Sequence, residues 1–166
     1  VVAIPLAHLV AGTRSFNINM PKEINRLVID ALSDYLFTAG VRSTGVATRE
    51  QSEQSQTYMV GNILMDTLRF NYNRFYKPDT LSELQEGEYI VFTLNRKALM
   101  DDIDNLERML QVMVQAAGET CIVAPLRGLA YQTVGDLNTD ILIIEPLNYL
   151  EFGWLIAHAK GVITDS

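Results

Sequence analysis

Short apolar runs alternate with helical segments along the whole chain, and this alternation constrains the fold more than any other feature. Parallel strands need long crossover connections, which are usually helices and almost always right-handed. The sequence therefore predicts an α/β fold built from parallel βαβ units. Helices separate most of the predicted strands, which are centred near Ile4, Leu36, Met59, Ile90, Ile122, Ile141 and Ile163.

Two segments carry the clearest apolar stripes at helical spacing. In residues 22–33 the stripe consists of Ile24, Leu27, Val28, Ala31 and Leu32. In residues 101–117 it consists of Ile103, Leu106, Leu110, Met113 and Ala117. Side chains at such intervals lie on one face of a helix, so both segments are predicted to be amphipathic helices.

Composition and charge exclude several classes of partner. The formal net charge is −7 and the isoelectric point is about 4.7, so the chain repels phosphate backbones and a nucleic-acid partner is not expected. No apolar run is long enough for a membrane span, so no membrane partner is expected either. The single cysteine, Cys121, leaves no internal disulfide and fits a reducing compartment, which favours the cytoplasm.

Polar residues cluster where predicted strands end, and ligands of open parallel sheets bind at this edge. They are His8 with Arg14, Asn95 with Arg96, Arg127, and Asp165 with Ser166. His8 and His158 are the only histidines and lie in different elements, so spacing predicts no metal site. His8 is either a buried structural histidine or a ligand-facing one. Glu23 and Arg26 are either an ion pair on one helix face or residues that face a cleft.

Five motifs occur in a fixed order along the chain. They are HLVAGTR at 8–14, PKEINR at 21–26, GN at 61–62, PLNYLEF at 146–152 and TDS at 164–166. Together they resemble the non-hydrolysing UDP-N-acetylglucosamine 2-epimerase family, whose pattern reads H-x-E-A-G-x-R, P-E-E-x-N-R, G-N, T-x-H-R, P-x-x-Y-x-x-F and T-D-S-G-G. The resemblance covers essentially the whole chain.

The resemblance implies two Rossmann-like parallel-sheet domains, as in the glycosyltransferase-B fold, with substrate in the cleft between them. Each domain is expected to be only partly present, because the sequence begins within an apolar strand and ends at an Asp-Ser turn. The chain then reads as an internal segment of a larger protein. The expected parts are the closing half of the first domain (1–70), an interdomain connector (71–87) and the opening half of the second, nucleotide-binding domain (88–166).

The reaction that the resemblance implies is the interconversion of UDP-GlcNAc and UDP-ManNAc by elimination and re-addition of UDP, without a cofactor or a metal. Carboxylates move the protons in this chemistry. Three positions depart from the family pattern: Val10 replaces a glutamate, Lys22 replaces the first glutamate of P-E-E, and Asn95 replaces a histidine. Valine cannot transfer a proton, so the chain is expected to be inactive as it stands.

Most of the positions that match the family belong to binding and framework. They are His8, Arg14, Glu23, Asn25 and Arg26 in the first part, and Arg96, Phe152 and Ser166 in the second. The resemblance places Phe152 near the uracil and Ser166 near a phosphate of a UDP-sugar, and a homodimer is compatible with these features. A non-catalytic nucleotide-sugar binding or regulatory module is one alternative function. A truncated structural unit with no ligand is another.

Overall fold

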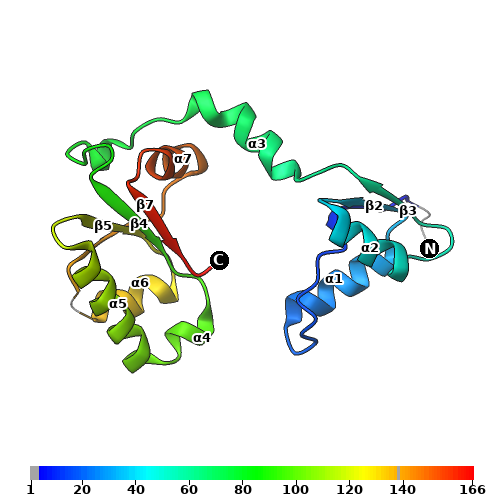
Figure 1. The fold of residues 1–166 in the computed structure, drawn as a ribbon, viewed down its shortest axis with the longest axis horizontal. Helices are drawn as coiled ribbons and strands as arrows, with labels where there is room; N and C mark the ends of the chain where they lie inside the picture. Colours follow the sequence, from blue (N-terminus) through cyan, green and yellow to red (C-terminus); the bar gives the residue numbers. More distant parts are fainter. Residues whose placement is uncertain (1–3, 138) are drawn as a thin grey trace. The chain divides into compact units, whose positions relative to one another are not determined.

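The computed structural model describes residues 4–137 and 139–166. The chain divides into a first unit that ends at Asn71 and a second unit that begins at Tyr72, and each contains one parallel sheet (Figure 1). Within the described residues, no helix is long and apolar enough to cross a membrane.

The first unit is a three-stranded sheet with helices between its strands. Its strands are β1 (Ala7–Ala11), β2 (Tyr35–Thr38) and β3 (Gln56–Met59), and its helices are α1 (Pro21–Leu32), α2 (Val41–Glu50) and α3 (Ile63–Asn71). The strands are parallel and lie in the order β1-β2-β3. Helices α1 and α2 lie on the same side of this sheet (Figure 1), as successive right-handed crossovers in one direction require.

Close packing in the first unit centres on the end of β1. The buried apolar cluster there consists of Ala11, Leu36 and Ala47. Gly12 follows β1 with φ of +71°. A Cβ atom at Gly12 would lie 2.0 Å from the Ser43 carbonyl oxygen, so only glycine lets α2 approach the strand end so closely.

The buried residues of α1 belong to its polar face. The helix is present, but its predicted apolar stripe is largely exposed, and Val28 and Leu32 are 51% and 69% exposed. The buried residues of α1 are Glu23 and Asp30. They are buried because the loop after β1 directs N–H groups and a guanidinium toward this face, and these groups satisfy both carboxylates.

The second unit is a four-stranded parallel sheet in the order β6-β5-β4-β7. Two 3-10 turns, η1 (Tyr72–Arg74) and η2 (Asp79–Leu81), precede it. The elements that follow are β4 (Tyr89–Thr93), α4 (Lys97–Met100), α5 (Ile103–Ala117), β5 (Cys121–Pro125), α6 (Leu129–Asp136), β6 (Ile141–Ile144), α7 (Tyr149–Ala157) and β7 (Gly161–Thr164).

The strand order of the second unit contains a topological switch. From β4 the chain moves outward through β5 to β6, and α7 then returns it to the opposite side of β4, where β7 pairs. Helices α5 and α6 consequently lie on one face of the sheet and α7 on the other (Figure 1). In open α/β sheets, ligands bind outside the carboxyl ends of the strands at such a switch, which here lies between β4 and β7.

The core of the second unit is apolar and is held by well-formed helix ends. Leu110 of α5 and Val134 of α6 are fully buried against β4 and β5. On the other face, Trp154 and Leu155 of α7 pack with Tyr89, whose hydroxyl donates to the Leu155 carbonyl at 2.8 Å. Burial, with a contribution from the Glu86 carboxylate, raises the pKa of Tyr89 to about 12.

Two contacts fix the position of α7. Asn148 caps its first turn by accepting from the N–H groups of Leu150 and Glu151 at 2.9 and 3.0 Å, and Glu151 accepts in return from the Asn148 N–H at 3.1 Å. The ring of Phe75 lies directly against Gly153, where a Cβ atom would come within 2.3 Å of it. The segment before β4 is thus packed closely on α7.

The predicted α/β class with two Rossmann-like parallel sheets is confirmed. The strands predicted near Leu36 and Ile90 are β2 and β4. The strand predicted near Ile163 is present as β7, an exposed edge strand that pairs only with β4 in the described sheet. The single cysteine, Cys121, is exposed at the start of β5.

Candidate functional site

The end of β1 has an unusual backbone at one of the three altered positions. The register between β1 and β2 shifts between Leu9 and Ala11, so Val10 occupies a bulge. Its φ is +67°, a left-handed conformation that a β-branched residue rarely adopts. Such outliers persist where the surrounding structure holds them, and they cluster at functional sites. The bulge turns the Val10 side chain outward, leaving it 39% exposed.

A buried carboxylate from α1 organises the strand end. Asp30 Oδ1 lies 2.5 Å from His8 Nδ1, and Asp30 Oδ2 accepts from the Gly12 N–H at 3.0 Å. The same Oδ2 lies 2.6 Å from Arg14 Nη2. The side chains of Asp30 and Arg14 are only 4% and 2% exposed. One carboxylate therefore joins the middle of β1, the glycine turn and the arginine that follows.

Arg14 is held as a permanent cation by two acids. Besides Asp30, its Nη2 lies 2.7 Å from Glu50 Oε2 at the end of α2. Burial pulls the pKa of Arg14 down, but hydrogen bonds to Glu50 and Asp30 outweigh burial and leave the pKa above its ordinary value. Because the Asp30 and Glu50 carboxylates neutralise the Arg14 guanidinium, it attracts an incoming anion only weakly.

Glu23 fixes the loop between β1 and α1. Its carboxylate accepts from the Ser15 N–H at 2.8 Å, the Ser15 hydroxyl at 2.9 Å and the Phe16 N–H at 3.0 Å. The Ser15 N–H contributes most to lowering the pKa of Glu23; burial opposes the shift, and the other two donors add to it. Arg26 Nη1 lies 3.8 Å from Glu23 Oε2. The structural ion pair is thus present, but the main role of Glu23 is to hold the loop.

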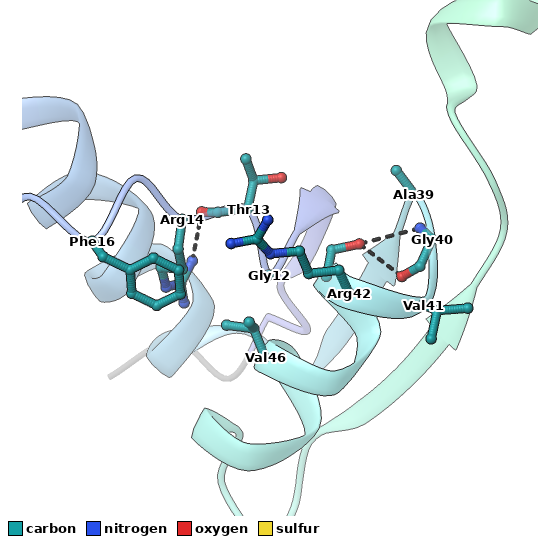
Figure 2. Close-up of a pocket in the computed structure, with 10 residues that line it drawn as sticks. Gly12, Thr13, Arg14, Phe16, Ala39, Gly40, Val41, Arg42 and Val46 are labelled. Atoms are coloured by element: carbon teal, nitrogen blue, oxygen red, sulfur yellow. Dashed lines mark hydrogen bonds between the residues drawn. The ribbon is translucent and has the colours of Figure 1, made fainter.

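A cavity of about 460 Å³ lies between this loop and the start of α2. Figure 2 shows Arg42 reaching from α2 toward Thr13 and Arg14, with Phe16 at the other side of the opening. Arg14 belongs to its lining, whereas His8, Glu23 and Arg26 do not. Lys22, the second altered position, lies exposed on α1.

A second cavity, of about 250 Å³, lies at the carboxyl ends of β4, β5 and β6. Asn95 lines it after β4, Arg127 after β5, and Phe152 approaches from α7. The half-buried ring of Phe152 also packs against the core of the second unit. The cavity thus combines an aromatic face with a cation and an amide, and small-molecule sites are commonly apolar clefts with a few such polar groups.

The ends of β4 and β7 are tied together beside this cavity. The Asp165 Oδ2 atom accepts from the backbone N–H groups of Asn95 at 2.7 Å and Arg96 at 2.5 Å. The Thr93 hydroxyl donates to the Thr164 hydroxyl at 2.8 Å, and the Ser166 N–H donates to the same Thr164 oxygen at 3.1 Å. These bonds lie at the topological switch between the two strands.

The structure groups the sequence-predicted residues into two sets. His8, Arg14, Glu23 and Arg26 lie in the first unit, and Arg96, Phe152 and Ser166 in the second. Of these, Phe152 lines the second cavity, while Arg96 precedes α4 and Ser166 follows β7, outside its lining. Asn25 is exposed on α1.

Sequence reasoning missed Asp30, and it noted Asp165 and Arg127 only as polar residues at strand ends. Asp30 had no signal, because its partners His8 and Arg14 lie 22 and 16 positions away. Within the described residues, no group of three or more His, Cys, Asp or Glu side chains could hold a metal ion.

Two parallel sheets, a topological switch in the second and polar residues at the strand ends define an α/β protein of the Rossmann-like type. The sequence profile of the UDP-N-acetylglucosamine 2-epimerase family matches residues 1–166, and the chain belongs to this family. The family resemblance stated from the motifs is therefore confirmed.

Individual relatives agree with this assignment. The UDP-2,3-diacetamido-2,3-dideoxy-D-glucuronate 2-epimerase of Pseudomonas aeruginosa is 32% identical over 169 residues, covering 98% of this chain and 47% of the relative. The UDP-N-acetylglucosamine 2-epimerase of Methanocaldococcus jannaschii is 30% identical, covering 98% and 49%. The chain thus spans about half the length of the curated relatives that it matches.

Solved structures show the same architecture. The crystal structure of the Methanocaldococcus jannaschii UDP-GlcNAc 2-epimerase in complex with UDP-GlcNAc and UDP superposes with a TM-score of 0.77 at 29% identity, covering 98% of this chain and 49% of that one. The enzyme from Neisseria meningitidis, at 21% identity and a TM-score of 0.80, supports the fold alone.

Proposed function

We propose that this chain binds the UDP part of a UDP-sugar in the second cavity and does not itself interconvert UDP-GlcNAc and UDP-ManNAc. The observation that carries the proposal is the lining of that cavity. An aromatic ring and a cation meet there at the carboxyl ends of three parallel strands, beside the topological switch. A relative of known structure holds UDP-GlcNAc and UDP.

In this proposal Phe152 stacks on the uracil, and Arg127 meets the diphosphate. Arg127 is exposed at the cavity wall, so its charge is available to a ligand. Arg96 and Ser166 approach the diphosphate from the ends of β4 and β7. The phosphate oxygens accept charge-assisted hydrogen bonds from the guanidinium, which are the stronger class of hydrogen bond.

The altered positions support the second part of the proposal, that the chain does not interconvert UDP-GlcNAc and UDP-ManNAc. The bulge and glycine turn of the first unit hold Val10 in a left-handed conformation, but a valine side chain has no proton to give or take. Lys22 is exposed and carries the opposite charge to a glutamate. Asn95 is an amide where the family pattern has an imidazole. Loss of one general acid–base group costs about 10²–10⁴ in rate, so loss of all three leaves no measurable turnover.

The expected affinity is low. A base–aromatic stack contributes about 1–3 kcal/mol, and a hydrogen bond to a charged group contributes about 1.5–3 kcal/mol. Association costs at least about 4 kcal/mol in lost freedom. These contributions barely exceed the cost of association, so we expect UDP to bind in the millimolar range or more weakly.

The test is a titration of the full chain with UDP, followed by NMR shift mapping. We expect saturable shifts at residues 93–95, 125–127 and 152. Phe152→Leu keeps an apolar side chain in the core but removes the aromatic face, and it should weaken binding about tenfold. Tyr131→Ala removes an exposed aromatic ring from α6, outside the cavity lining, and should leave binding unchanged.

The charge of Arg127 has a matched control on α5. Arg127→Ala should weaken UDP binding about tenfold, whereas Arg108→Ala, which removes an exposed arginine from α5, should not. Micromolar binding that survives Phe152→Leu would place the ligand elsewhere. Shifts confined to other residues, or no shifts at all, would favour a structural unit without a ligand.

A further inference from the structure

One carboxylate oxygen holds the turn that follows β4. The Asp165 Oδ2 atom accepts from two consecutive backbone N–H groups, those of Asn95 at 2.7 Å and Arg96 at 2.5 Å. Both distances are short, as expected when the acceptor is an ionised carboxylate. Asp165 and the turn are about seventy residues apart in the chain, so this contact joins two strand ends that no local sequence feature connects.

The turn held in this way forms part of the wall of the second cavity. Thr93, Leu94 and Asn95 line the cavity, and Arg96 is the N-cap of α4, where its extended backbone starts the helix. The ladder between β4 and β7 ends at the pair Thr93 and Thr164. Beyond that pair, the direction of the chain after β4 is set by Asp165.

The second oxygen of the same carboxylate offsets part of what the first contributes to stability. Oδ1 is buried and has no hydrogen-bond partner among the described residues. A buried acceptor without a partner carries a desolvation cost that offsets what the paired oxygen contributes. Asp165 also lies outside both apolar clusters of the second unit. Its contribution is therefore to the geometry of the cavity wall.

We infer that Asp165 is a positioning residue for the UDP site: its carboxylate fixes the Asn95–Arg96 turn so that the cavity wall is formed before the ligand arrives. This inference rests on the proposed function. It assigns Asp165 no contact with the ligand. The inference predicts that UDP affinity depends on the negative charge of the Asp165 side chain as well as on its shape. A neutral amide would make weaker hydrogen bonds to the two N–H groups than the carboxylate does.

Asp165→Asn is the variant that tests the inference, with Asp140→Asn as its matched control. Asp140 is an exposed aspartate before β6, at the opposite edge of the same parallel sheet. The full chain of each variant is studied by amide NMR and titrated with UDP. In Asp165→Asn the amide protons of Asn95 and Arg96 should move upfield, because a strong acceptor has become a weak one.

The affinity for UDP should fall about tenfold in Asp165→Asn and stay unchanged in Asp140→Asn. The thermal midpoint and the exchange protection of the buried amides of β4 and β5 should stay at the wild-type values in both, which separates positioning from a role in folding. Asp165→Ala should weaken UDP at least as much as Asp165→Asn does.

Three results would overturn the inference. Unmoved Asn95 and Arg96 amides would show that the carboxylate does not hold the turn. Moved amides with wild-type affinity would show that the turn does not shape the site. A fall in affinity matched by general loss of amide protection would assign Asp165 to folding. If the wild-type chain binds no UDP, the proposed function itself fails and the inference falls with it.

Discussion

The two units of this chain hold their sheets together by different means. Among the described residues, the buried acids, serines and threonine lie in the first unit: Glu23, Asp30, Ser33, Thr38 and Ser55. The apolar cluster of that unit consists of three residues. The second unit contains two extended apolar clusters in which helices from both faces pack against the sheet. One interior is organised by hydrogen bonds and charge, and the other by burial of apolar surface.

This difference shows what each unit can supply to a binding site. Hydrogen bonds to backbone N–H groups fix the path of a loop, so the first unit specifies the conformation of the strand end with Val10 and Gly12. An apolar core is less directional but supports a cavity with rigid walls. The second cavity is lined by four segments. Three of them are the turns that follow β4, β5 and β6, the strands of that core, and the fourth is α7.

The largest effect should follow from removing the central acid of the first unit. Asp30→Ala takes a partner from His8, the Gly12 N–H and a buried guanidinium that stays charged, and it should cost about 3–5 kcal/mol. Hydrogen exchange should show lost protection in residues 7–59 and none lost in β4 or β5. Asp66→Ala, an acid in the first turn of α3, should change neither region. If the amides of residues 7–59 kept wild-type protection in Asp30→Ala, buried hydrogen bonds and charge would not be what stabilises the first unit.

A similar cost in the second unit should come from a purely apolar change. Leu110→Ala removes a fully buried side chain from the cluster between α5 and the sheet, and it should cost about 2–5 kcal/mol. Val112→Ala, on the same helix but 64% exposed, is the control and should cost little. Equal effects of the two variants would mean that α5 is not packed as described.

A smaller effect, of opposite sign, is expected at the bulge in β1. Val10→Gly should stabilise the first unit by about 1 kcal/mol, because the left-handed conformation costs an L-residue about 1–2 kcal/mol and glycine nothing, with part of the gain lost to the freer unfolded chain. Leu9→Gly, one residue earlier in the regular part of the strand, should destabilise. The thermal midpoints of both variants test this prediction. A lower midpoint in Val10→Gly would argue against the bulge at Val10.

The smallest effect is a dependence on pH. The folded pKa of Glu23 lies below its ordinary value of 4.5, so its contribution to stability is fully present above that pH and is lost as the pH falls through the folded pKa. Protection of the Ser15 and Phe16 amides should therefore fall in acid below about pH 4.5. Glu23→Gln should remove this dependence, and an unchanged acid response in Glu23→Gln would assign it to another group.

Much of the second unit could be predicted from the sequence, because strand and helix periodicity records burial in an apolar core. The strand near Ile90 was found in this way, and so was the helix predicted over 101–117, which the structure places at 103–117. The same reasoning identified α1 as an amphipathic helix but could not show that its buried face is the polar one. Periodicity shows only where apolar side chains lie, and α1 buries Glu23 and Asp30, whose partners come from a loop in a different part of the chain.

The residues around the second cavity could be predicted only in part. Strand-end residues and the family motifs led to Phe152, and the structure places it in a cavity with Asn95 and Arg127. Whether Arg96 or Arg127 faces that cavity depends on the direction of two turns after their strands. The turn after β4 is held by Asp165, which lies about seventy residues further along the chain.

The central claim is that binding of UDP is retained where the chemistry is lost, and one NMR experiment tests both parts. UDP-GlcNAc is incubated with the chain in D₂O, and saturation is transferred from protein to ligand while the sugar signals are followed. The account predicts transfer to the uracil protons that weakens in Phe152→Leu, with no loss of the carbon-2 proton and no UDP-ManNAc. Deuterium at carbon 2, or signals of UDP-ManNAc that vanish in Arg96→Ala, would contradict it.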